Sequence, residues 1–176
     1  MTTVLALDIA SETGAAWDAP GGRRPLCSTW RAPYASTKEF GPRFAAFFRW
    51  LDDVIVVVKP DLLAFEAPLV PHGSNMRTSA DTVRYLIGLA SIAETVASMH
   101  LIEAVEENVA TIKKHFTGNG RADKGGMLAR ARALNWACRN DHEADAAALW
   151  CYVKAIDDPA WSFIATPIGH HLEGQR

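Results

Sequence analysis

Short apolar runs in this sequence alternate with longer segments in which apolar residues recur every three or four positions. The first run, residues 4–9, is almost continuously apolar and stops at the turn-forming residues SETG, which is typical of a strand buried on both faces. Residues 15–18 and 26–31 follow two such turns, so the start of the chain predicts a meander of three strands. Two later runs, 62–65 and 101–105, predict two further strands.

Five segments have the spacing of helices. Apolar residues three and four apart across 37–58 predict a helix that covers a sheet, and Pro60 ends it. A second helix, 79–99, carries small residues that allow close contact with another helix. The other three helices are expected at 108–118, 124–136 and 140–152. Asn140 begins the last one, with Glu143 three residues later in the spacing of a capping box. Strand–helix units after a meander predict an α/β fold with a mixed sheet.

Composition adds the domain organisation. The 176 residues are 49% hydrophobic and 22% charged, which indicates one globular domain, expected over 1–156, with an irregular tail at 157–176. Three cysteines without a CxxC pair argue against a disulfide framework or a zinc ribbon. We expect a cytoplasmic protein with no membrane partner, because the first strand follows no signal segment and the run 54–58 is too short to span a bilayer.

Basic and acidic residues are unevenly distributed along the chain. The net charge is only −2, but residues 111–139 hold seven basic residues and one acidic residue. The other 11 basic residues stand against 19 acidic ones. Such a basic segment on an otherwise acidic protein indicates a phosphate-bearing partner, although a solvated helix face explains the same pattern equally well.

Carboxylates stand where the pattern predicts burial. Asp8 lies inside the first apolar run, and Glu66 directly follows the strand at 62–65. His142 and Asp145 are three residues apart, so they share one face at the start of the last helix. Three alanines follow Asp145 and allow this helix to approach a sheet closely. We therefore expect the acidic groups of two strands and one helix to meet.

A cation would make such a meeting favourable. Two like charges 4 Å apart cost about 4 kcal/mol at an effective dielectric constant near 20. Oxygen-rich sites with one imidazole suit Mg²⁺ or Mn²⁺, and two such ions can hold both the attacking water and the leaving oxygen of a phosphodiester. Taken singly, each residue has a plainer explanation. Asp141 can be a first-turn acidic residue that interacts favourably with the helix dipole, and His142 can be a surface or capping residue. Asp8 and Glu66 can pair with arginines.

Four motifs, in this order, resemble the RuvC family of Holliday-junction endonucleases, which belongs to the ribonuclease H-like superfamily. They are VLALDIASETGAAW in the first hairpin, LLAFEAP at the fourth strand, KKHFTGNGRADK between two helices, and DHEADAAAL at the start of the last helix. The resemblance covers most of residues 3–154. It implies an α/β ribonuclease H-like fold, in which helices flank a mixed five-stranded sheet built from a three-strand antiparallel meander and two parallel strands.

The resemblance also implies an activity, the resolution of four-way junctions in branched DNA by a Mg²⁺-dependent homodimer. It assigns catalysis and the binding of two Mg²⁺ ions, for which Mn²⁺ can substitute, to Asp8, Glu66, His142 and Asp145. It places the helix 79–99 in the dimer interface. DNA contacts are expected from the basic segment and from the position where relatives often carry an aromatic residue, namely Lys113, Lys114, Arg121, Lys124 and Leu69.

The sequence is compatible with two other functions. A broader nuclease of the same fold would act on forks, flaps or RNA, and Leu69 in place of an aromatic residue leaves room for it. A non-catalytic nucleic-acid-binding module is a different class, but a protein that only binds phosphates gains nothing from clustered carboxylates. Sugar kinases and actin-like ATPases share the first-strand aspartate, but they need a second large domain that 176 residues do not supply.

Overall fold

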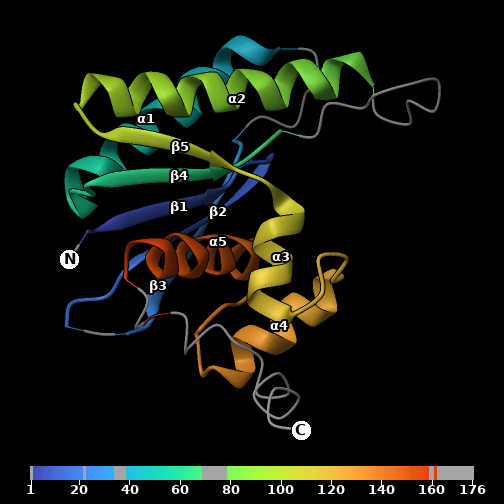
Figure 1. Cartoon of the computed structure of the whole chain (residues 1–176). Coiled ribbons are helices and arrows are strands. Elements are labelled where there is room, and N and C mark those ends of the chain that lie inside the picture. The colour runs from blue at the N-terminus through green and yellow to red at the C-terminus, as the bar shows by residue number, and fades with distance from the viewer. Residues whose placement is uncertain (1, 22, 34–38, 69–78, 159–160, 162–176) are drawn as a thin grey trace, which may run out of the picture.

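The centre of the molecule is a five-stranded sheet with the strand order β3-β2-β1-β4-β5 (Figure 1). The computed structural model describes residues 2–21, 23–33, 39–68, 79–158 and 161. Within these residues the strands are β1 (Val4–Asp8), β2 (Glu12–Asp18), β3 (Pro25–Arg31), β4 (Leu62–Glu66) and β5 (Glu103–Glu107). β2 is antiparallel to β1 and β3, whereas β1, β4 and β5 run parallel. The expected mixed sheet is confirmed.

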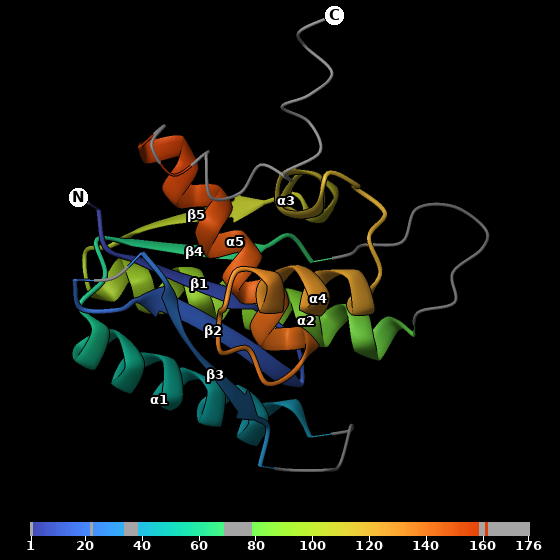
Figure 2. The same ribbon diagram turned by 90° about the horizontal axis from the view of Figure 1, so that it is seen from below.

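Helices cover both faces of this sheet. One face carries α1 (Phe40–Val58) and α2 (Ala80–Met99), and the other carries α3 (Val109–Thr117), α4 (Lys124–Ala133) and α5 (Asp141–Asp157) (Figure 1). Seen from the side of the second layer, α5 lies over β1 and β2 (Figure 2). Among the described residues, no helix combines the length and apolar character needed to cross a membrane.

The alternation of side chains along β1 and β4 decides which layer each residue meets. Leu5 and Leu7 pack in the core under α1 and α2, whereas Val4 and Ala6 pack in the core under α5. Because successive strand residues point to opposite faces, Asp8 falls on the α5 face. The same alternation in β4 puts Glu66 on that face as well. Both carboxylates therefore stand at the carboxyl ends of neighbouring strands, facing α5.

Several element boundaries differ from the expected ones; β2, for example, begins at Glu12 instead of residue 15. β5 begins at Glu103 instead of residue 101, because Leu101 adopts a left-handed conformation (φ 59°) and is 95% exposed in the turn after α2. α4 ends at Ala133, because Asn135 is also left-handed (φ 56°) and the Trp136 N–H returns to the Ala131 carbonyl. α5 continues to Asp157, five residues beyond its expected end.

The small residues of α2 serve packing inside the chain. A Cβ at Gly88 would lie 2.3 Å from the ring of Phe44 on α1, so the glycine lets the two helices approach each other. Ala90 and Ala97 are buried in the core that α1 and α2 share with the sheet. The close helix contact expected from these residues is therefore made with α1, and a homodimer through the helix 79–99 stays a prediction.

Candidate active site

Three carboxylates from three elements line one cavity. Asp8 is the last residue of β1 and Glu66 the last of β4, and the preceding residues of these strands, Leu7 and Phe65, are register partners. Asp145, from the second turn of α5, completes the set. The cavity has a volume of about 260 Å³, and Lys113 and the residues that follow β1 and β4 also line it.

The carboxylates in this cavity lack enough partners. Within the described residues, Glu66 Oε1 and Asp145 Oδ1 are buried without a hydrogen-bond partner. Burial and the charges of Asp8 and Asp145 raise the pKa of Glu66 to about 8. Burial and the charge of Asp8 raise the pKa of Asp145 to about 6. Unpartnered oxygens that repel one another are the donor set that a hard divalent cation neutralises.

His142 joins the site through Asp8. Its Nδ1 lies 2.7 Å from Asp8 Oδ2, and the hydrogen bond to Asp8 is the largest cause of the raised pKa of His142. In the part of the chain that the structure describes, no group of three or more His, Cys, Asp or Glu side chains is gathered into a metal-binding cluster as it stands. Metal binding by this set therefore stays a prediction, which the donor types and the unpartnered oxygens fit.

The basic residues expected at the site fall into three groups. Lys113 lines the cavity, and its Nζ donates to the Ala122 carbonyl at 3.1 Å. Lys124 forms an ion pair with Asp141, and the hydrogen bond from Lys124 lowers the pKa of that aspartate. Lys114 and Arg121 are exposed and do not line this cavity. The remaining candidate, Leu69, lies outside the described residues.

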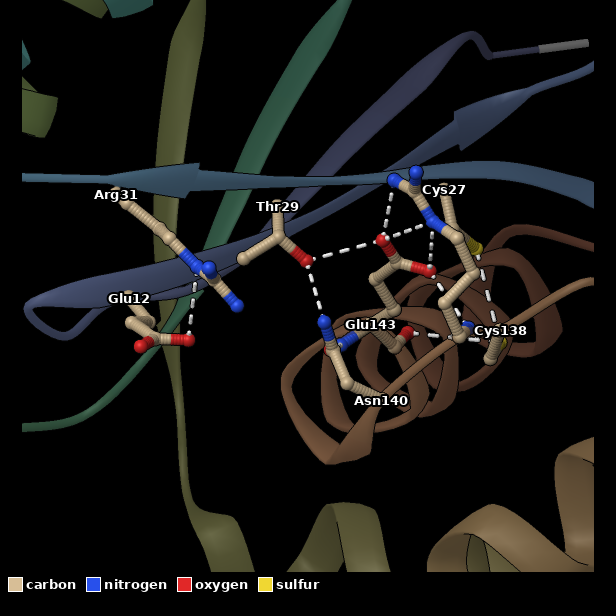
Figure 3. A network of polar contacts seen from close by, with 8 residues as sticks. Glu12, Cys27, Thr29, Arg31, Cys138, Asn140 and Glu143 are labelled. Carbon is tan, nitrogen blue, oxygen red and sulfur yellow. Dashed lines mark hydrogen bonds and ion pairs between the residues drawn. The ribbon is translucent and has the colours of Figure 1, made fainter.

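A polar network around the buried Glu143 holds the start of α5 against β3 (Figure 3). Asn140 Oδ1 accepts from the Glu143 N–H at 2.9 Å, which is the cap expected from the sequence. The carboxylate of Glu143, however, accepts from the backbone and guanidinium of Arg139 and from the Thr29 hydroxyl instead of returning to Asn140. Glu143 is fully buried, so this network fixes the turn that carries His142.

Gly14 brings α5 directly onto the backbone of β2. A Cβ at this position would lie 1.9 Å from the carbonyl oxygen of His142 and 2.4 Å from its carbonyl carbon. The alanines of α5 contribute to the same close approach, because Ala144, Ala146 and Ala147 are completely buried. A glycine within a strand often marks such a contact, and this signal was available in the sequence.

We expect replacement of Glu66 by Gln to stabilise the metal-free protein. The pKa of about 8 in the folded protein lies above the ordinary value of 4.5. The free energy of unfolding of the wild type therefore falls as the pH rises between these values, because the buried carboxyl must ionise. At pH 7 the loss amounts to about 3 kcal/mol, and near pH 4.5 it vanishes. Denaturant unfolding in a chelator from pH 5 to 8 measures it. Glu94→Gln, on the exposed side of α2, serves as the control, and parallel pH profiles for wild type and Glu66→Gln would contradict the expectation.

Comparisons with known proteins concern the fold. No protein-family model matches the sequence, and no curated protein matches it either. RuvC from Thermus thermophilus has a TM-score of 0.63 at 19% identity, over 84% of this chain and 90% of that chain. RuvC from the same organism in complex with a Holliday junction substrate has a TM-score of 0.66 at 15% identity, over 85% and 90% of the two chains. The yeast mitochondrial Holliday junction resolvase has a TM-score of 0.61 at 11% identity, over 92% and 79%.

These similarities cover between 84% and 92% of this chain. They confirm the expected α/β fold of the ribonuclease H-like type, with its mixed five-stranded sheet flanked by helices. At identities of 19% and below, they show the fold alone. The function must be argued from the site.

Proposed function

We propose that this chain is a metal-dependent endonuclease that resolves four-way junctions in branched DNA. The observation that carries the proposal is the set of carboxylates from β1, β4 and α5, with unpartnered buried oxygens, in one cavity with Lys113. Clustered carboxylates oppose phosphate binding unless cations neutralise them, whereas a nuclease needs both features together. The similarity to a RuvC structure that contains a Holliday junction substrate supports four-way DNA as the substrate.

The residues of the site would hold two Mg²⁺ ions, with Mn²⁺ as a substitute. Asp8, Glu66, Asp145 and His142 are the proposed ligands, and the ions would supply Lewis-acid activation of water and neutralise charge on the phosphate. Asp8 acts on both of the other carboxylates, because its charge raises the pKa of Glu66 and of Asp145.

Lysines would position the DNA strand. Lys113 reaches into the cavity from α3, where its ammonium group can bind the phosphate to be cut. Lys124 lies at the start of α4 and is held by Asp141, an exposed ion pair that a phosphate can replace at small cost. Lys114 and Arg121 would contact DNA further from the cavity.

A homodimer through the helix 79–99 and a cytoplasmic location complete the proposal. α2 exposes two large apolar residues, Ile87 at 43% and Met99 at 63%. Exposed apolar side chains on one helix are compatible with a helix-to-helix interface, which is the arrangement that we propose.

A cleavage panel tests the proposed activity. Labelled four-way junction, fork, flap, linear duplex and RNA–DNA hybrid are incubated with Mg²⁺, Mn²⁺ or a chelator. We expect metal-dependent cleavage of the junction at least about tenfold faster than that of the duplex. Faster cleavage of forks, flaps or hybrid would favour a broader nuclease. No cleavage with either metal, together with no calorimetric binding of Mn²⁺, would favour a non-catalytic binding module.

A further inference from the structure

A second hollow adjoins the active-site cavity. It lies between the starts of α1 and α2, and its described lining is Ser11, Phe40, Arg43, Ser79, Asp81, Thr82 and Tyr85. Two of these residues follow or precede residues that line the active-site cavity, since Ser11 follows Ala10 and Tyr85 precedes Leu86. The two hollows therefore adjoin each other at the turn after β1 and along α2.

A buried cation stands in this second hollow. Arg43 is only 6% exposed; its Nη2 donates to Ser11 Oγ at 2.8 Å, and its guanidinium lies 3.9 Å from the centre of the Tyr85 ring. Within the described residues, Arg43 makes no ion pair and its buried Nε has no hydrogen-bond partner. A guanidinium stays charged in proteins, so this site holds a desolvated positive charge that is paired with no carboxylate of the described residues.

Tyr85 adds a second unused donor. The side chain is 4% exposed, and its buried hydroxyl group has no well-aligned hydrogen-bond partner among the described residues. Burial raises the pKa of this hydroxyl, and the neighbouring side chains of Arg43 and Ser11 lower it in part. The hydroxyl and Arg43 Nε are the donors in the hollow that lack acceptors. The start of α1 adds to them, because its cap residue, Glu39, makes no side-chain hydrogen bond to the first-turn amides. The carboxylate of Asp81 also lines the hollow, from an exposed position in the first turn of α2.

The unpartnered groups of the two hollows have opposite requirements. Five buried side-chain atoms lack a partner in the described part of the chain. Those of Glu66 and Asp145, in the active-site cavity, need a cation or a donor, whereas those of Arg43 and Tyr85, in the adjoining hollow, need an acceptor. The fifth atom, in His115, lies beside Tyr152 on the α3 side.

We propose that the Arg43–Tyr85 hollow binds a phosphate of the DNA backbone that is not the phosphate being cut. A phosphodiester carries one negative charge and two free oxygens, which can accept from Arg43 Nε and from the Tyr85 hydroxyl. DNA as the source of this phosphate rests on the proposed function. The hollow would fix the position of the strand relative to the acidic cavity.

Salt dependence of junction binding tests this proposal. Arg43→Gln is compared with Arg49→Gln, an exposed arginine on the same helix, both in an Asp8→Asn background so that binding is measured without cleavage. We expect Arg43→Gln to weaken binding about tenfold and to reduce the slope of log K against log salt by about 0.9, the value for one neutralised phosphate. Arg49→Gln should change neither quantity. An unchanged slope for Arg43→Gln, or an equal change in both variants, would overturn the proposal.

A second variant keeps the proposal testable if Arg43→Gln does not fold. Tyr85→Phe removes only the hydroxyl group and keeps the ring under the guanidinium. We expect junction binding to weaken about threefold to tenfold with an unchanged salt slope, because the lost hydrogen bond is uncharged. Binding equal to that of the parent protein would overturn the assignment. These assays measure binding only, so they decide the phosphate site even if the cleavage panel shows no nuclease activity.

Discussion

Replacement of Asp8 by Asn is expected to abolish junction cleavage and to leave junction binding within about threefold of the wild type. Asp8 interacts with each of the other proposed ligands, since it hydrogen-bonds His142 and its charge acts on both Glu66 and Asp145. Asparagine keeps the shape but removes the anionic oxygen that a hard cation requires. Loss of an outer partner of a metal site already costs about 10-fold to 100-fold, so loss of a proposed ligand should cost at least about 1000-fold.

Single-turnover cleavage and gel-shift binding of the same labelled junction measure the two effects separately. Asp141→Asn is the matched control, because Asp141 is a carboxylate in the first turn of α5 whose charge also acts on Asp145, but it is paired with Lys124. This control should keep cleavage within about tenfold of the wild type, as expected for an exposed ion pair. Cleavage retained by Asp8→Asn would contradict the mechanism. An equal loss in both variants would show that general negative charge matters instead of Asp8 itself.

The carboxylate site could be predicted in large part because strand geometry constrains it. An acidic residue at the end of each of two buried strands points to one sheet edge once the strands are parallel neighbours. Asp8 and Glu66 therefore follow from the apolar pattern together with the order of the elements. Asp145 follows from the alanines behind it, which predict a helix close to the sheet. These arguments need only local periodicity and the order of the elements.

Contacts between distant segments could not be predicted in this way. Thr29 accepts a hydrogen bond from Asn140 and donates one to Glu143, more than 110 residues later, and only the seating of α5 against β3 brings them together. The sequence does indicate that Arg43 is unusual, because it lies three residues after Phe40 and four before Phe47, on the apolar face of the helix. A charged residue on that face needs a buried partner, but the pattern does not say which one.

The close seating of α5 leads to the second large effect, which is expected for Gly14→Ala. The added Cβ would overlap the carbonyl of His142, and these are backbone atoms that cannot move aside by rotation of a side chain. α5 would have to shift away from β2, against the buried network that ties Glu143 to Thr29 and Arg139. Overpacking of a tight core costs about 1–3 kcal/mol and occasionally more. We expect a loss at the upper end, about 3 kcal/mol.

Thermal unfolding and junction cleavage together test this expectation. A loss of about 3 kcal/mol lowers the Tm of a protein of this size by roughly 6–12 °C. Cleavage should fall as well, because the shift displaces the turn that carries His142. Gly41→Ala is the control, since a Cβ at this exposed position of α1 meets nothing within 4 Å. That variant should unfold at or slightly above the wild-type temperature, because alanine is the better helix former. A wild-type Tm and wild-type cleavage for Gly14→Ala would mean that α5 does not rest on the β2 backbone, and the placement of His142 beside Asp8 would fall with it.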